Sequence, residues 1–285
     1  MEKTVVRCLT EKVAALRERR PLIHHLTNYV VMNDCANMVL AAGGSPVMAH
    51  APEEVAELAA VSGALVLNIG TLTTDWIEAM ITAGRAANEA GAPVVLDPVG
   101  AGATRLRTDS CLRILQEVKV SVVRANASEA AVLAGQDARV KGVDAVSGDG
   151  FAAARALARR FNLVAAVTGV LDYVSDGRRT YRIANGDAWL SRITGTGCMA
   201  SSVVACFCAV EEDYLTAAAS ALAFYGAAGE IAAGKAPPDP GAPAPAPPTG
   251  PMAFKNALFD AVYSLPGEKA ARLARVEAVP DGGAE

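Results

Sequence analysis

The stretch ITGTGCMASS, residues 193–202, places a single thiol directly after a glycine-rich turn. Gly195 and Gly197 let backbone amides converge, and the small and apolar residues after Cys198 indicate that a helix begins there. A helix N-terminus binds anions such as phosphate and lowers the pKa of a nearby thiol. The chain contains no P-loop pattern and no early GxGxxG fingerprint. The stretch alone indicates either an anion site or simply a tight, well-packed turn.

Polar residues follow several short apolar runs. Asp97 comes directly after PVVL, Arg124 comes after VSVV, and Thr168 closes LVAAVT. Asn126 and Glu129 have the spacing of a helix N-cap and its capping partner. A single Asp after a strand is more often a cap or turn residue than a ligand. Several such residues at the ends of neighbouring strands favour a binding site.

The elements that must position these residues are buried strands alternating with amphipathic helices. The strands are predicted at residues 64–69, 93–96, 120–123 and 163–168, and the helices at 53–61, 74–89, 106–118 and 150–161. This order predicts an α/β fold of three layers, α/β/α, with a mostly parallel central sheet. Ligands of such sheets bind at the carboxyl ends of the strands.

The rest of the chain departs from this alternation. Asp176-Gly177 lies between two β-rich runs and predicts a hairpin in residues 171–183, hence an antiparallel edge. Residues 198–234 and 254–265 have helical patterns. The Pro/Ala-rich stretch at about 236–250 predicts an extended surface loop, and the last few residues a ragged tail. We therefore predict a single domain over residues 1–285.

Composition excludes several classes of partner. The net charge of the 285 residues is −4, so no basic field attracts nucleic acid. No apolar run reaches the ~18 residues that cross a bilayer, and the N-terminus has no signal-peptide stretch. The six cysteines form no CxxC pair and mostly lie among apolar residues, which is typical of reduced thiols. We expect a cytoplasmic protein with no nucleic-acid or membrane partner.

Six motifs occur in an order that resembles the hydroxyethylthiazole kinase family. They are HLTNYVVMNDCANMVLAAGGSPVMA, LNIGTLT, VVLDPVGAGAT, RANASE, AVTG and TGTGCMAS. The resemblance spans residues 21–227 and 250–265, whereas the Pro/Ala-rich residues 236–248 depart from the family pattern. It implies a ribokinase-like fold and the ATP-dependent phosphorylation, with Mg²⁺, of the hydroxyl of 4-methyl-5-(2-hydroxyethyl)thiazole. It also implies a homotrimer with active sites between subunits.

On the acceptor side, the resemblance implies that Met48 contacts the thiazole, that Asn28 lies in the same pocket and that Gly195 belongs to the substrate side of the turn. An adaptable Met suits a small apolar heterocycle, although plain core packing would explain it equally well. In related kinases an aspartate commonly closes this turn and accepts the hydroxyl proton. This family has a cysteine there, so Cys198 is a weak base, a steric shaper of the pocket, or both.

On the nucleotide side, the resemblance implies that Arg124 and Thr168 contact ATP, and that Asp97 and Glu129 lie near the metal and phosphates. The donor fork of Arg suits a polyphosphate. Mg²⁺ usually takes one or two protein carboxylates together with phosphates and water, so two acidic residues suffice, either directly or through water.

Three other functions are compatible with parts of the pattern. Another ribokinase-like kinase, such as one for a hydroxymethylpyrimidine, would share the fold and the turn. A catalytically silent ATP-binding or thiazole-sensing protein would keep the fold, but the full set of motif carboxylates argues against it. A cysteine hydrolase would need His24, His25 or His50 beside the thiol, and none has a motif context.

Overall fold

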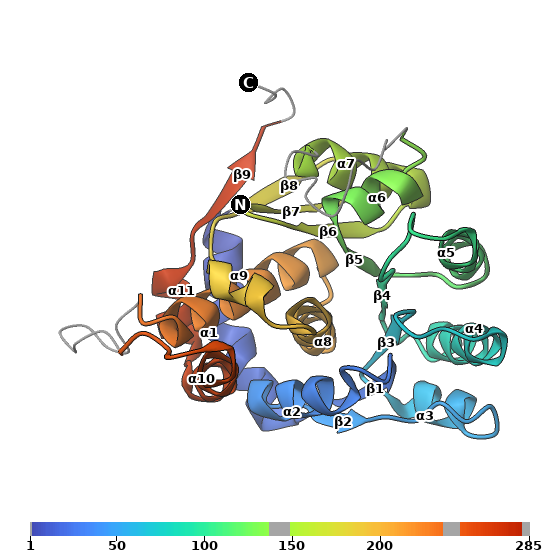
Figure 1. Ribbon diagram of the computed structural model, residues 1–285, viewed down its shortest axis with the longest axis horizontal. Coiled ribbons are helices and arrows are strands. Elements are labelled where there is room, and N and C mark those ends of the chain that lie inside the picture. Colours follow the sequence, from blue (N-terminus) through green and yellow to red (C-terminus); the bar gives the residue numbers. More distant parts are fainter. Residues whose placement is uncertain (1, 137–148, 236–245, 281–285) are drawn as a thin grey trace.

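A computed structural model of the chain describes residues 2–136, 149–235 and 246–280, and in them the backbone forms one nine-stranded sheet (Figure 1). The sheet order is β2-β1-β3-β4-β5-β6-β7-β8-β9. Pairing is parallel from β2 through β6 and antiparallel from β6 through β9. The strands are β1 Leu22–Leu26, β2 Ser45–Val47, β3 Ala64–Asn68, β4 Val94–Asp97, β5 Val122–Asn126, β6 Val164–Thr168, β7 Asp172–Ser175, β8 Thr180–Ile183 and β9 Val276–Val279.

Helices cover both faces of the sheet, which confirms the predicted three layers (Figure 1). On one face, the helices and the sheet enclose the larger hydrophobic cluster. This layer contains α1 Glu2–Arg19, α2 Met32–Ala42, α8 Thr196–Cys208, α9 Tyr214–Ala232, α10 Pro251–Ser264 and α11 Gly267–Leu273, with the short 3-10 helix η1 Ala188–Arg192. The other layer is α3 Val55–Val61, α4 Thr74–Glu89, α5 Arg105–Glu117, α6 Ala127–Leu133 and α7 Gly150–Phe161.

The central strands are apolar because helices press on them from both sides. Every residue of β3 and of β4 is buried. Such strands read as continuous hydrophobic runs instead of alternating ones, and the sequence pattern located β3, β4 and β6 within two residues. The fifth strand was predicted at residues 120–123 but lies further along the chain. It begins at Val122 and continues to Asn126, because residues 122–126 pair in register with β6. Arg124 therefore lies inside the strand and not after it.

Helix α9 forms much of the core. Helix α9 is apolar over 19 residues, and by length and composition it could cross a membrane, which contradicts the expectation that no segment is long and apolar enough. Within the protein, 94% of its apolar window is buried. It packs against α8, α1 and α10, so its hydrophobicity is accounted for by the protein interior.

The predicted hairpin is confirmed by β7 and β8, and the helices after Cys198 by α8 and α9. Further elements had not been predicted from the sequence: α1, β1, α2 and β2 at the N-terminus, and β9, which pairs with β8 near the C-terminus. Most of the predicted Pro/Ala-rich loop, residues 236–245, and the predicted tail, residues 281–285, lie outside the described residues.

The contact between α1 and α11 leaves no room for a side chain at Gly267. A Cβ there would lie 2.3 Å from the carbonyl oxygen of Leu9 and 2.9 Å from that of Thr10. We expect Gly267→Ala to lower the free energy of unfolding by about 1–3 kcal/mol, because backbone must shift to admit the methyl group. Urea unfolding checks this. Gly250→Ala is the control, since its Cβ would meet nothing within 4 Å, and an equal loss in both variants would contradict the steric explanation.

Candidate active site

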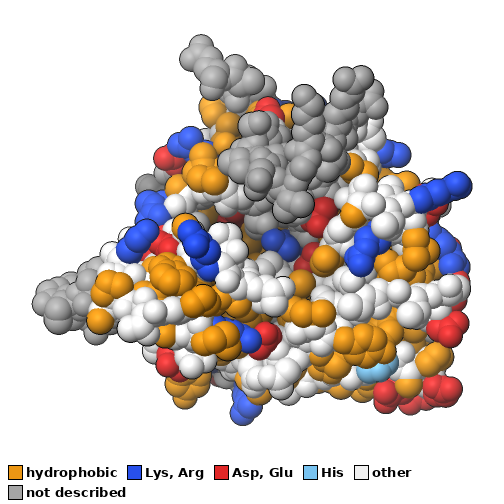
Figure 2. Space-filling view, viewed as in Figure 1, with side chains coloured by type: hydrophobic (Ala, Val, Ile, Leu, Met, Phe, Trp, Pro, Cys, Tyr) orange, Lys and Arg blue, Asp and Glu red, His pale blue; other side chains and the backbone are white. Residues whose placement is uncertain are grey.

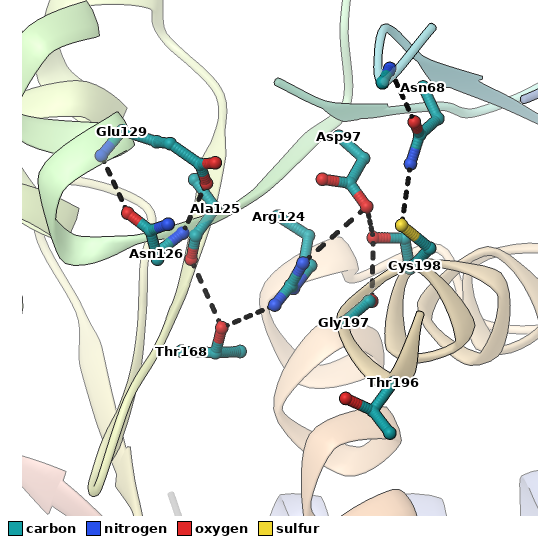
Figure 3. A network of polar contacts seen from close by, with 12 residues as sticks. Asn68, Asp97, Arg124, Ala125, Asn126, Glu129, Thr168, Thr196, Gly197 and Cys198 are labelled. Carbon is teal, nitrogen blue, oxygen red and sulfur yellow. Dashed lines mark hydrogen bonds and ion pairs between the residues drawn. The ribbon is translucent and has the colours of Figure 1, made fainter. Parts of the chain in front are cut away.

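The carboxyl ends of β3, β4, β5 and β6 bring the candidate polar residues to one edge of the sheet. The strand register places Asn68 beside Asp97, and Asn126 beside Thr168. The N-terminus of α8 faces this edge (Figure 3). Two segments far apart in the sequence, the strand ends and the glycine turn, therefore form one site, as parallel sheets generally build them.

The glycine turn brings backbone close to two neighbours. Gly195 is the N-cap residue of α8 and has φ of 91°, and a Cβ there would lie 2.6 Å from a methyl carbon of Val31. At Gly197 a Cβ would lie 2.8 Å from both terminal nitrogens of Arg124. The guanidinium therefore lies directly against the first turn of the helix, and a side chain at position 197 would require the guanidinium to shift.

Asp97 is completely buried and is the centre of the network. Its Oδ2 accepts a hydrogen bond from the Ser201 hydroxyl at 2.8 Å and lies 3.6 Å from Nη1 of Arg124. Its Oδ1 has no hydrogen-bond partner among the described residues. Burial raises the pKa of the Asp97 carboxyl, while Arg124 and Ser201 act in the opposite direction.

Arg124 links Asp97 to Thr168, which the sequence comparison predicted to contact the nucleotide. Its Nη2 donates to the Thr168 hydroxyl at 2.7 Å, and that hydroxyl lies 3.4 Å from the carbonyl oxygen of Ala125 (Figure 3). Arg124 and Thr168 also line a cavity of about 510 Å³, together with Gly197. This volume is within the range of small-molecule sites. Figure 2 shows a hollow near the middle of one face, with basic and acidic side chains in it.

Glu129 serves first as a capping residue. Its Oε2 accepts the Asn126 amide at 2.9 Å, and the Asn126 side chain accepts the Glu129 amide at 2.8 Å, which confirms the predicted capping box of α6. Its Oε1 accepts the amide of Gly100, from the loop after β4, at 2.8 Å. Burial and the nearby Asp97 charge raise the pKa of Glu129. The carboxylate thus ties α6 to the Asp97 loop.

The thiol of Cys198 accepts hydrogen bonds from two amide side chains. Nδ2 of Asn68 lies 3.2 Å from Sγ, and Nδ2 of Asn28 lies 3.6 Å from it. Burial, followed by the Asp97 charge, raises the pKa of Cys198 to about 11. The expectation that the helix N-terminus lowers this pKa is therefore wrong, because desolvation outweighs the helix and the amide donors.

Met48 stands apart from this network. It follows β2 directly and is half-buried against the same apolar cluster as Cys198. The structure thus brings Asn28, Asp97, Arg124, Thr168, Glu129, Gly195 and Cys198 to one edge of the sheet, and Met48 to the neighbouring end of β2.

Three further polar residues of the site were not identified from the sequence. Asn68 ends β3, Ser201 is one turn beyond Gly197, and Asp172 lines the cavity and accepts the Gly169 amide at 2.9 Å. Burial raises the pKa of Asp172 to about 7. A lone Asn in an otherwise apolar strand was the available signal for Asn68, because such a residue must find hydrogen-bond partners inside the protein.

The histidines interact with other groups. Nε2 of His25 lies 3.0 Å from the Ser202 hydroxyl, Nε2 of His24 lies 2.7 Å from the Ala49 carbonyl oxygen, and His50 stacks on Trp76 at 4.7 Å between ring centroids. Burial lowers the pKa of His24 and brings that of His25 to about 4. These contacts give a cysteine hydrolase no support.

A mostly parallel sheet between two layers of helices is the fold of ribokinase-like small-molecule kinases, and the chain shares it with solved structures of such kinases. A solved structure of pyridoxal kinase from Staphylococcus aureus in complex with AMP-PCP and pyridoxal is 14% identical, with a TM-score of 0.56 over 90% of this chain and 97% of that one. At this identity the similarity concerns the fold alone.

Within that class the relatives agree on one family. The profile of the hydroxyethylthiazole kinase family matches residues 13–268. Hydroxyethylthiazole kinase of Roseiflexus sp. is 53% identical over 93% of this chain and 95% of its own, and that of Chloroflexus aurantiacus is 53% identical over 95% and 98%. A solved structure of hydroxyethylthiazole kinase from Pyrococcus horikoshii is 42% identical, covers 96% of this chain and 99% of its own, and has a TM-score of 0.83. The chain belongs to the hydroxyethylthiazole kinase family.

The environment of Cys198 predicts an unusual pH dependence of alkylation. The thiolate is the nucleophile, so with a pKa of about 11 the rate constant with iodoacetamide should rise about tenfold per pH unit, without levelling off, between pH 7 and 9. The other five cysteines are buried, and Cys198→Ser measures their background reaction. A plateau below pH 8.5 would show that the thiol ionises readily and would contradict the dominance of burial.

Proposed function

We propose that the protein transfers the γ-phosphoryl group of ATP to the hydroxyl of 4-methyl-5-(2-hydroxyethyl)thiazole, a step of thiamine salvage. The observation that carries this proposal is the Arg124 guanidinium against Gly197, at the N-terminus of α8 and beside the Cys198 thiol. The positive charge of the guanidinium and the free amides at the helix N-terminus would stabilise the phosphoryl group during its transfer. The names of the relatives supply the acceptor.

The nucleotide would occupy the cavity lined by Arg124, Thr168 and Gly197. Arg124 is held at Nη2 by Thr168 and at Nη1 by Asp97, so its fork is oriented before a polyphosphate binds. Preorganised charge of this kind stabilises the transferring phosphoryl group without further rearrangement.

The thiazole would lie on the other side of the turn, between Asn28, Gly195 and Met48. Asn28 is buried and oriented by Asn68 at 2.8 Å, and the close approach of Val31 to Gly195 supplies an apolar wall. A small apolar ring with one hydroxyl needs such a pocket, with few polar groups to orient it. Met48 adds an adaptable apolar contact.

The residues fit a magnesium ion held mainly by ATP. Asp97 Oδ1 is buried without a partner, and Glu129 is close enough for the Asp97 charge to raise its pKa. No group of three or more potential ligand side chains occurs in the part of the chain that the structure describes, and Mg²⁺ with one or two carboxylates plus phosphates and water needs none. When bound, the ion would neutralise phosphate charge. Asp97 and Glu129 would hold it, directly or through water.

The thiol is a poor base in this setting. A pKa of about 11 keeps Cys198 neutral at pH 7, so little thiolate is present to take the hydroxyl proton. Phosphoryl transfer has a loose transition state in which positioning and charge stabilisation dominate. Cys198 would therefore act chiefly by shaping the pocket around the acceptor hydroxyl.

We further propose that the chain is one cytoplasmic kinase domain that assembles into a homotrimer with sites between subunits. Tyr29 and Val30 follow Asn28 directly, and both are more than 60% exposed. Met48 lies at the edge strand β2. Large apolar side chains exposed beside a binding pocket are typical of a surface that a partner covers. Light scattering coupled to gel filtration measures the assembly, and a monomer at micromolar concentration would contradict it.

The direct test of the activity is a comparison of acceptors. With ATP and Mg²⁺, the protein should phosphorylate the hydroxyethylthiazole, and a hydroxymethylpyrimidine at equal concentration should react at least tenfold more slowly by kcat/KM. Phosphate transfer is followed by mass spectrometry of the product. Preference for the pyrimidine would assign the chain to another kinase activity, and binding of both ligands without turnover would indicate a silent sensor.

The two carboxylates should matter for turnover more than for acceptor binding. Asp97→Asn and Glu129→Gln remove negative charge where metal and phosphates would meet, so we expect kcat to fall at least tenfold in each. The Kd for the thiazole should stay within about threefold of the wild type. Calorimetry and steady-state kinetics measure the two quantities. Wild-type turnover at saturating Mg²⁺ would exclude the assigned roles.

Replacement of the thiol separates base catalysis from positioning. Serine is nearly isosteric with cysteine and keeps the glycine turn, so we expect Cys198→Ser to lose less than about 10²-fold in kcat. General base catalysis would give a loss of about 10²–10⁴-fold. Cys198→Asp, which supplies the carboxylate of related kinases, should remain active. Measurement at saturating substrates from pH 6 to 9 decides, and a loss beyond about 10³-fold would make the thiol an essential base.

A further inference from the structure

Asn68 is the polar residue of an otherwise apolar, fully buried strand. It ends β3, and its side chain makes three hydrogen bonds. Oδ1 accepts from the Gly70 amide at 3.0 Å and from Nδ2 of Asn28 at 2.8 Å, while Nδ2 donates to Sγ of Cys198 at 3.2 Å. A buried amide with this many partners connects three elements: the end of β1, the end of β3 and the start of α8.

The network also determines which way the amide faces. The Gly70 amide and the Asn28 amino group are both donors, so the oxygen of Asn68 must face them. The opposite orientation would set the Asn68 amino group against two other donors. The Asn28 orientation is determined in turn, because its own oxygen accepts the Val30 amide at 3.1 Å. Both amino groups are thereby directed at the sulfur.

We propose that Asn68 is a positioning residue for phosphoryl transfer, which holds Cys198 Sγ and the Asn28 amide in the arrangement that the acceptor hydroxyl meets. This rests on the proposed function. Two donors on the sulfur fix its position relative to Asn28, and therefore the side of the pocket against which the hydroxyl lies. A displacement of about 1 Å in such a constellation is enough to cost about 10²-fold in rate.

The role on the reaction is tested by kinetics. We expect Asn68→Ala to lower kcat at least tenfold and to change KM for ATP less than threefold, because the side chain bonds to Asn28, Gly70 and Cys198 and not to Arg124 or Thr168. In a Cys198→Ala background, the same substitution should cost less than a third of what it costs in the wild type, since the sulfur that it positions is gone. A loss that is equal in both backgrounds, or one confined to KM for ATP, would overturn the proposal.

The contact with sulfur is tested without any phosphoryl transfer. Asn68→Asp keeps the size of the side chain but replaces the donor by an oxygen, so it should slow alkylation of Cys198 by iodoacetamide at pH 9 at least fivefold. Asn37→Asp, on the exposed face of α2, is the matched control and should stay within twofold. An unchanged or faster reaction in Asn68→Asp would overturn the contact. If the wild type does not phosphorylate the thiazole while alkylation responds as expected, the proposed function fails and the contact stands.

Discussion

The site depends on the placement of one negative charge inside the protein. Asp97 has no exposed surface, and its principal compensation is the Arg124 guanidinium at 3.6 Å together with the Ser201 hydroxyl. A buried ion pair contributes little net stability, but removal of one partner costs about 3–5 kcal/mol because it leaves the other charge uncompensated. Arg124 must therefore stay at the sheet edge, and its position determines where Thr168 and Gly197 can lie.

The same constraint explains the glycine turn. A guanidinium held between Asp97 and Thr168 occupies the space that a side chain at position 197 would need. The first turn of the helix therefore packs against a guanidinium group. Burial of this assembly also raises the thiol pKa. The proposed phosphate position and the neutral thiol thus both depend on one desolvated arrangement.

The sequence was sufficient for the features that depend on local pattern. Continuous apolar runs located β3, β4 and β6, and the Asn126–Glu129 spacing identified a real capping box. Local sequence pattern does not predict features that depend on contacts between residues far apart in the chain. The sequence marks Asn68 only as a polar residue in an apolar run, and the fold alone brings it to Cys198, 130 positions away. The thiol pKa was misjudged for the same reason, since the burial that controls it comes from other segments.

The first two turns of α8 carry residues that contact different parts of the site. Gly197 accommodates Arg124, Cys198 meets Asn28 and Asn68, and Ser201 binds Asp97. A shift or rotation of this helix would therefore alter the contacts with Arg124 and Asp97 and those with Asn28 and Asn68 together. The acceptor range of such an enzyme is therefore hard to change through α8. Evolution or design that seeks a bulkier alcohol has more freedom at Val31, the N-cap residue of α2, and at Met48, which follows β2, because these apolar side chains form no hydrogen bonds with the charged network.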